Sequence, residues 1–120
     1  MAKKLKDLLP SELETLPNIS NDHSNLGDEL IHLHLWNAKK MNWYLAEYSP
    51  ISKKFFGYLE DPRDTLSSGS YSINDILSYS KRGDDWEPMV DEGWKPIAAK
   101  EIVRLQGYIE LMSTGTDDFI

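Results

Sequence analysis

Three segments in the first half of the chain decide the fold: IHLHLW at 31–36, NWYLAEY at 42–48 and KFFGYLE at 54–60. In the first, Ile and Leu alternate with His and Trp, and the other two are rich in the aromatic residues that strands favour. Only five residues separate each segment from the next. Because parallel neighbours need a long crossover, the three segments predict an antiparallel meander. Gly57, inside the third segment, indicates a bulge or an aromatic ring lying over the strand.

The flanking sequence predicts short helices and one further strand. Residues 67–71 fit a fourth strand, and Ser72 is expected to cap a following helix that ends at 81–83, with Asp75 at the third position and a Tyr71–Ile76 staple. Residues 9–17 predict a short helix between two prolines, and 18–27 a loop. Residues 86–94 contain a strand or an extended edge. After Pro96 a last helix carries one apolar stripe, composed of Ile102, Leu105, Ile109 and Met112.

These elements predict one α+β domain over residues 1–113, with an antiparallel sheet of about four strands and short flanking helices. Residues 114–120 are expected to form a frayed acidic tail. A length of 120 residues fits one such domain. The basic start of the chain lacks the apolar stretch of a signal peptide, and no stretch reaches the ~20 apolar residues of a membrane helix. We therefore expect a cytoplasmic protein without membrane contact.

Composition removes several classes of function. The chain has no Cys, which excludes disulfides, thiolate zinc sites and a cysteine nucleophile. The sequence also lacks GxSxG, Walker and GxGxxG motifs, so no cofactor is expected and an enzyme is less expected than a binding protein. A net charge of −7 and a pI near 4.8 argue against direct nucleic-acid binding. The aromatic strands resemble a base-stacking platform, but packing within the sheet is the simpler role for their rings.

The negative charge is concentrated in the second half of the chain. Residues 1–60 carry seven basic and eight acidic side chains, whereas residues 61–120 carry six and twelve. The densest part predicts a partner-binding surface of acidic and aromatic residues, comprising Asp84, Asp85, Trp86, Glu87, Asp91, Glu92 and Trp94. The same carboxylates lack the spacing of a calcium loop, and a solvated surface is the plain alternative to acid–base chemistry.

Two histidines offer a rival hypothesis. His32 and His34 lie two positions apart on a predicted strand, so both are expected on one face, and His23 in the preceding loop could complete a three-ligand zinc site. No HExxH-like spacing supports the metal, and half-buried histidines on the wet face of a strand are the plain alternative.

The order of the segments resembles a known family. The matching elements are the His/Leu strand, NWYLAEY at 42–48, FFGY at 55–58, GSYSINDI at 69–76 and WKP at 94–96. Together, over roughly residues 8–103, they resemble DUF2958, a bacterial and archaeal family of unknown function. The resemblance implies a small α+β protein of the kind often carried on plasmids, phages and other mobile elements, with no catalytic residues to carry over.

The sequence thus leads to an acidic, non-enzymatic interaction protein. If the mobile-element association holds, the partner is expected to be a basic nucleic-acid-binding protein, such as a host defence protein that the acidic half inhibits. A small metal-dependent enzyme using His32 and His34 and a purely structural or oligomerisation domain are the two alternatives; the sequence leaves the oligomeric state open.

Overall fold

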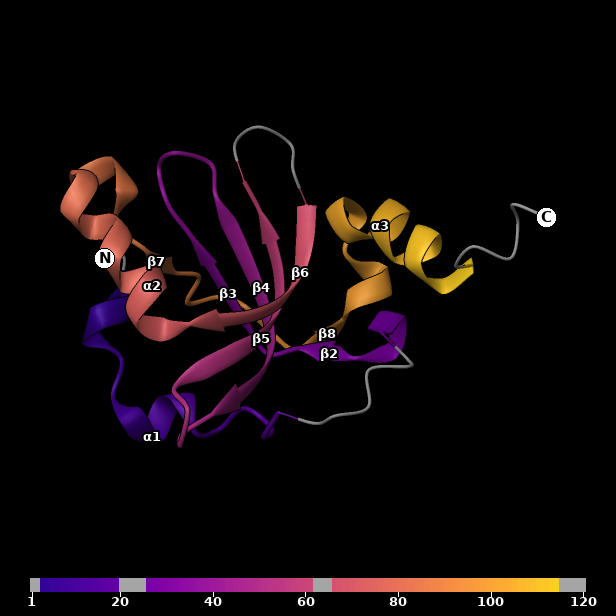
Figure 1. Cartoon of the computed structure of the whole chain (residues 1–120), viewed down its shortest axis with the longest axis horizontal. Helices are drawn as coiled ribbons and strands as arrows, with labels where there is room; N and C mark the ends of the chain where they lie inside the picture. The colour runs from indigo at the N-terminus through magenta and orange to yellow at the C-terminus, as the bar shows by residue number, and fades with distance from the viewer. Residues whose placement is uncertain (1–2, 20–25, 62–65, 115–120) are drawn as a thin grey trace.

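The computed structural model describes residues 3–19, 26–61 and 66–114, and a six-stranded antiparallel sheet forms its centre (Figure 1). The strand order is β1-β7-β3-β4-β5-β6. The strands are β1 (Lys3–Lys4), β3 (Leu33–Trp36), β4 (Asn42–Ser49), β5 (Lys54–Glu60), β6 (Leu66–Ser72) and β7 (Met89–Val90). A second, two-stranded sheet pairs β2 (Leu30–Ile31) with β8 (Ile97–Ala98).

Short helices flank the sheet. The α-helices are α1 (Pro10–Leu13), α2 (Ile73–Ser78) and α3 (Val103–Thr114). The described residues also form five 3₁₀ helices: η1 (Leu5–Asp7), η2 (Leu26–Asp28), η3 (Tyr79–Arg82), η4 (Asp84–Trp86) and η5 (Ala99–Glu101). No helix in the described part of the chain is both long and apolar enough to cross a membrane.

The α+β class is confirmed, and the meander is seen in β3, β4, β5 and β6, each antiparallel to the next. The prediction of about four strands was too low. The strands it missed, β1 and β8, have two residues each, too few for an alternating pattern to show. The expected strand or edge within 86–94 is β7, which pairs with both β1 and β3.

The segment 31–36 is not one continuous strand. It breaks at His32, so that Ile31 pairs with Ile97 in the small sheet while Leu33 pairs with Leu45 in the large one. The backbone N–H of His32 donates to the carbonyl of Leu45, 2.9 Å away. Because the strand breaks at His32, the expectation that His32 and His34 share one face of a strand is wrong.

A β-bulge in β4 changes which residues face which side of the sheet. The register with β5 runs Leu45 opposite Gly57 and then Glu47 opposite Phe56, which leaves Ala46 as the extra residue. The bulge therefore lies on the strand next to Gly57 and not on β5 itself. Gly57 is needed because a Cβ there would lie 2.1 Å from the carbonyl oxygen of Tyr44; the close neighbour is backbone, not the ring that the sequence suggested.

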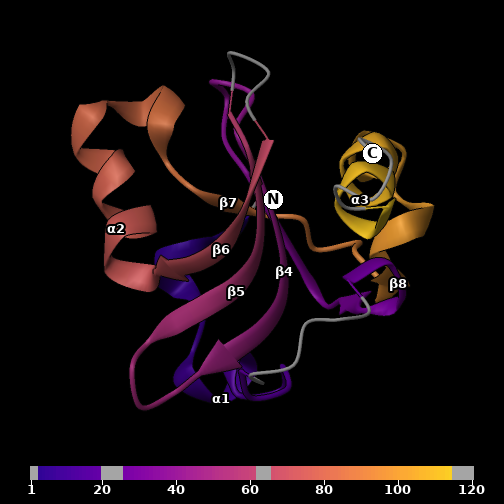
Figure 2. The ribbon, with the colours of Figure 1, turned by 45° about the vertical axis from the view of Figure 1, so that its right-hand side comes forward.

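Both faces of the sheet are covered, with α2 on one side and α3 on the other (Figure 2). The α2 face carries the larger core: Leu5, Leu13, Leu16, Leu35, Met41, Trp43, Leu45, Tyr48, Phe55, Ile76 and Val90. The α3 face carries a second core: Ile31, Tyr44, Ala46, Tyr58, Ala99, Leu105 and Ile109. A strand that packs on both faces needs apolar residues throughout, which explains why β4 is almost fully buried.

The helix predictions largely hold. The hydroxyl oxygen of Ser72 accepts the N–H of Asn74 at 3.2 Å, as an N-cap should, and α2 with η3 ends at Arg82. The stripe on the last helix is confirmed for Leu105 and Ile109, which are buried. The side chain of Met112 and the predicted tail from 115 onward lie outside the described residues.

Candidate functional site

The first part of the predicted partner surface, Asp84 to Glu87, lies on the side of the α2 face. Trp86 stacks on Tyr79 with ring centres 6.1 Å apart, and the guanidinium of Arg82 lies 5.0 Å from the Trp86 ring. The ammonium of Lys39 is 5.5 Å from the same ring. The exposed carboxylates of Asp84 and Asp85 therefore share their surroundings with cations, which weakens the local negative field.

The remaining residues of that surface have different surroundings. Glu87 is 13 % exposed and lies 3.8 Å from the ammonium of Lys6. Trp94 packs against the core of the α3 face and donates its indole N–H to the carbonyl of Ile31 at 2.9 Å. Trp86 and Trp94 therefore pack against opposite faces of the sheet.

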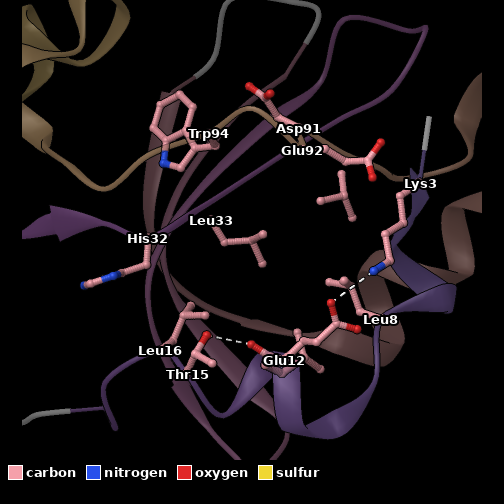
Figure 3. Close-up of a pocket in the computed structure, with 12 residues that line it drawn as sticks. Lys3, Leu8, Glu12, Thr15, Leu16, His32, Leu33, Asp91, Glu92 and Trp94 are labelled. Carbon is pink, nitrogen blue, oxygen red and sulfur yellow. Dashed lines mark hydrogen bonds and ion pairs between the residues drawn. The ribbon is translucent and has the colours of Figure 1, made fainter. Parts of the chain in front are cut away.

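Asp91, Glu92 and Trp94 line a groove with a volume of about 380 Å³ between α1 and the segment after β7 (Figure 3). Its floor is apolar: Leu8, Leu13, Leu16, Leu33 and Val90. Its rim is polar: Lys3, Glu12, Thr15, His32, Asp91 and Glu92, with Trp94 at one end. We call this hollow the acidic groove. An apolar floor inside a charged rim suits a ligand with one apolar group next to a charge.

The rim of the acidic groove is net negative. It holds one lysine against three carboxylates, and the lysine, Lys3, is already paired with Glu12 at 3.0 Å. The hydrogen bond from the Leu9 N–H and the bond from Lys3 lower the pKa of Glu12. Burial lowers the pKa of His32, so this ring adds no positive charge at neutral pH. Glu92 is exposed and has the freest access to a partner's cation.

His34 holds one wall of the acidic groove in place. Its Nδ1 lies 2.9 Å from the Oδ2 of Asp91, and its Nε2 lies 2.8 Å from the Oδ1 of Asn42. The ring also stacks on Tyr44, 4.9 Å away, and lies 5.0 Å from Trp94. Both nitrogens of His34 are thus engaged, and a metal ion would have to displace one of these bonds.

The predicted metal ligands do not come together in the described part of the chain. His32 lines the acidic groove, while His34 lines a separate polar cleft on the other side of β3. His23 lies outside the described residues. Over 3–19, 26–61 and 66–114, no group of three or more His, Asp or Glu side chains is placed to hold a metal ion.

The hydrogen bonds of His34 continue across the sheet to α3. The amide of Asn42 donates to Glu60 Oε1 at 3.0 Å, and Nη1 of Arg104 donates to Glu60 Oε2 at 2.6 Å. Sequence reasoning missed Asn42, Glu60 and Arg104. The meander alone could have suggested that the start of β4 lies near the end of β5, but nothing in the sequence places Arg104 beside them.

Comparisons of the chain with protein-family models, curated proteins and solved structures give no match. The resemblance to DUF2958 stays a prediction, and the geometry described above is the basis for any functional argument.

Proposed function

We propose that this protein is a non-enzymatic interaction protein that binds a basic protein partner through the acidic groove. The observation that carries the proposal is that the apolar residues Leu13, Leu16 and Leu33 line the same groove as Asp91 and Glu92. The net charge of −7 acts in the same direction, because it steers cationic partners toward the molecule.

The two parts of the groove have different roles in this proposal. The floor would accept an aliphatic side chain, and burial of that apolar surface supplies affinity. The acidic rim would pair with a neighbouring Lys or Arg, which supplies orientation and speeds association. A segment with an apolar residue next to a cation therefore fits the groove better than a purely charged one.

The partner class follows from charge. Basic surfaces are typical of proteins that bind DNA or RNA, because such proteins neutralise phosphates. We propose that the acidic protein occupies such a surface and inhibits its owner, a host or mobile-element nucleic-acid-binding protein. Carboxylates carry the same sign of charge as the phosphates they would replace.

A peptide titration tests the groove. With ¹⁵N-labelled protein, a short peptide of alternating Leu and Lys should shift the backbone resonances of Thr15, Leu16, Leu33 and Glu92, and binding should weaken as salt rises. The Glu92→Lys variant should bind about fivefold more weakly, as expected for one exposed charge pair.

The Asp85→Lys variant is the matched control, because it makes the same kind of charge reversal at an exposed position outside the groove. It should change the affinity much less than Glu92→Lys. Equal weakening by both variants, or binding that does not depend on salt, would show that the peptide responds to net charge alone and would contradict the proposed site.

A further inference from the structure

A second hollow, the polar cleft, lies between the β3–β4 hairpin, the end of β5 and the start of α3. Its volume is about 540 Å³, and its lining includes His34, Trp36, Lys40, Asn42, Glu60 and Arg104. This volume falls within the range of small-molecule sites. The cleft shares only His34 with the residues that hold the acidic groove in place, so its ligand is independent of the partner proposed for that groove.

The floor of the polar cleft is fixed before any ligand arrives. Hydrogen bonds run from Asp91 through His34, Asn42 and Glu60 to Arg104, with each step between 2.6 and 3.0 Å. The Asn42 amide donates to Glu60, so its oxygen faces His34, and both ring nitrogens of His34 then face acceptors. Polar groups placed this rigidly on a sheet face are typical of preorganised binding sites.

Two cationic side chains line the polar cleft, one from α3 and one from the β3–β4 hairpin. Arg104 comes from α3; its side chain is 65 % exposed, and its Nη1 donates to Glu60. A guanidinium has five N–H donors, so several remain for a ligand. Glu60 is 11 % exposed and accepts hydrogen bonds from both Arg104 and Asn42, so both of its carboxylate oxygens are engaged within the protein.

Lys40 comes from the hairpin, and the hairpin is held in one shape. Asn37 is 3 % exposed, and its side-chain oxygen accepts the N–H groups of Lys39 and Met41, each at 3.1 Å. The Asn37 N–H also donates to the carbonyl of Met41. Lys40 therefore leaves a fixed backbone, and it lines the same cleft as Arg104.

We propose that the polar cleft binds a small anionic ligand, with a phosphate or carboxylate group held between Arg104 and Lys40. Arginine recognises both groups through paired N–H donors, and lysine adds a second positive charge. Trp36 supplies an aromatic wall for the rest of the ligand. Asp61 also lines the cleft, and its carboxylate opposes an anion, so it limits the charge that the site accepts.

Calorimetric titration of the full chain with inorganic phosphate and, separately, with succinate tests this site. Saturable binding of one ion per chain is expected for at least one probe, and the tighter probe identifies the ligand group. Lys40→Gln should weaken binding about tenfold and leaves the hydrogen bonds among His34, Asn42 and Glu60 in place. Asp61→Asn should strengthen it.

Lys100→Gln is the control, because Lys100 is 60 % exposed and pairs with Asp28 outside the polar cleft. Its affinity should equal that of the unmodified chain. Arg104→Gln should abolish binding but also leaves Glu60 without its cation, so Lys40→Gln decides the outcome. The absence of saturable binding to both probes, or an equal loss in Lys100→Gln, would overturn the proposal.

Discussion

Replacing Gly57 by alanine is expected to destabilise the fold by about 4 kcal/mol or more, at the upper end for a single substitution. The new Cβ would lie 2.1 Å from the Tyr44 carbonyl oxygen and 2.8 Å from the Leu45 Cα. Both are backbone atoms of the neighbouring strand, so no side-chain rotation relieves the clash. Urea unfolding followed by circular dichroism measures the effect.

Gly107 provides a control with the opposite sign. It lies inside α3, and a Cβ there would meet nothing within 4 Å. Gly107→Ala should therefore stabilise the protein by about 0.5 to 1 kcal/mol, the usual gain from alanine in a helix interior. If Gly57→Ala unfolded at the same urea concentration as the unmodified chain, the close approach of β4 and β5 at this point would be wrong.

The second large effect is a loss of stability as the pH rises from about 4.5 to about 7. The Glu29 side chain, just before β2, shares a hydrogen bond with that of Glu47, which is 8 % exposed. Burial, and then the bond to Glu47 and its charge, raise the pKa of Glu29 to about 7. The folded state thus binds this proton more tightly than the unfolded chain does, and the gain disappears when the proton leaves.

The expected loss of stability is about 2 kcal/mol. This is less than the full shift of the Glu29 pKa would give, because Glu29 is partly exposed. His32 acts in the opposite sense: burial lowers its pKa, so its contribution to stability rises with pH through about 6.5. The comparison of the unmodified chain with Glu47→Gln isolates the carboxyl pair, since His32 is common to both. Unfolding by urea at a series of pH values measures the difference.

The Glu47→Gln variant should lose the part of this decline that comes from Glu47, because the amide removes the second charge of the pair, and should keep the part that comes from the burial of Glu29. Exposed Glu101 provides the matched control, and Glu101→Gln should keep the full decline. A decline of the same size in Glu47→Gln would mean that the two carboxyl groups do not share a proton.

The local parts of the fold were predictable from the sequence because local rules determine them. The meander follows from aromatic segments with short connections, and the α2 start follows from Ser72 as an N-cap. The break at His32 and the bulge at Ala46 were not predictable, because pairing with β8 and β5 produces them. The bulge has the larger effect on the core, because residues opposite each other on neighbouring strands face the same side of the sheet. Beyond the bulge, Glu47 therefore faces the same side as Phe56, and Tyr48 faces the same side as Phe55.

The candidate sites were predictable only in part. Asp91, Glu92 and Trp94 were singled out from charge and aromatic content, but their floor comes from α1 and β3, which no spacing in the sequence links to them. The polar cleft was missed because its residues lie on β3, β4, β5 and α3, and each looks ordinary alone. Asn42 is half-buried at a strand start, and Arg104 is an exposed helix residue.

One edge strand of the six-stranded sheet, among the residues that the structure describes, has a consequence for how these molecules behave at high concentration. At the opposite end from β1, β6 is seven residues long, and its outer backbone groups could add a strand from another chain. The strand reads LSSGSYS, so most of its side chains are hydroxyls or hydrogen. Such a strand has little apolar surface to hold an added strand from another chain. The hydroxyl of Ser68 is also already hydrogen-bonded to the hydroxyl of Tyr108 in α3. We therefore expect resistance to amyloid-like stacking to come from the composition of one strand as well as from the charge of the whole chain.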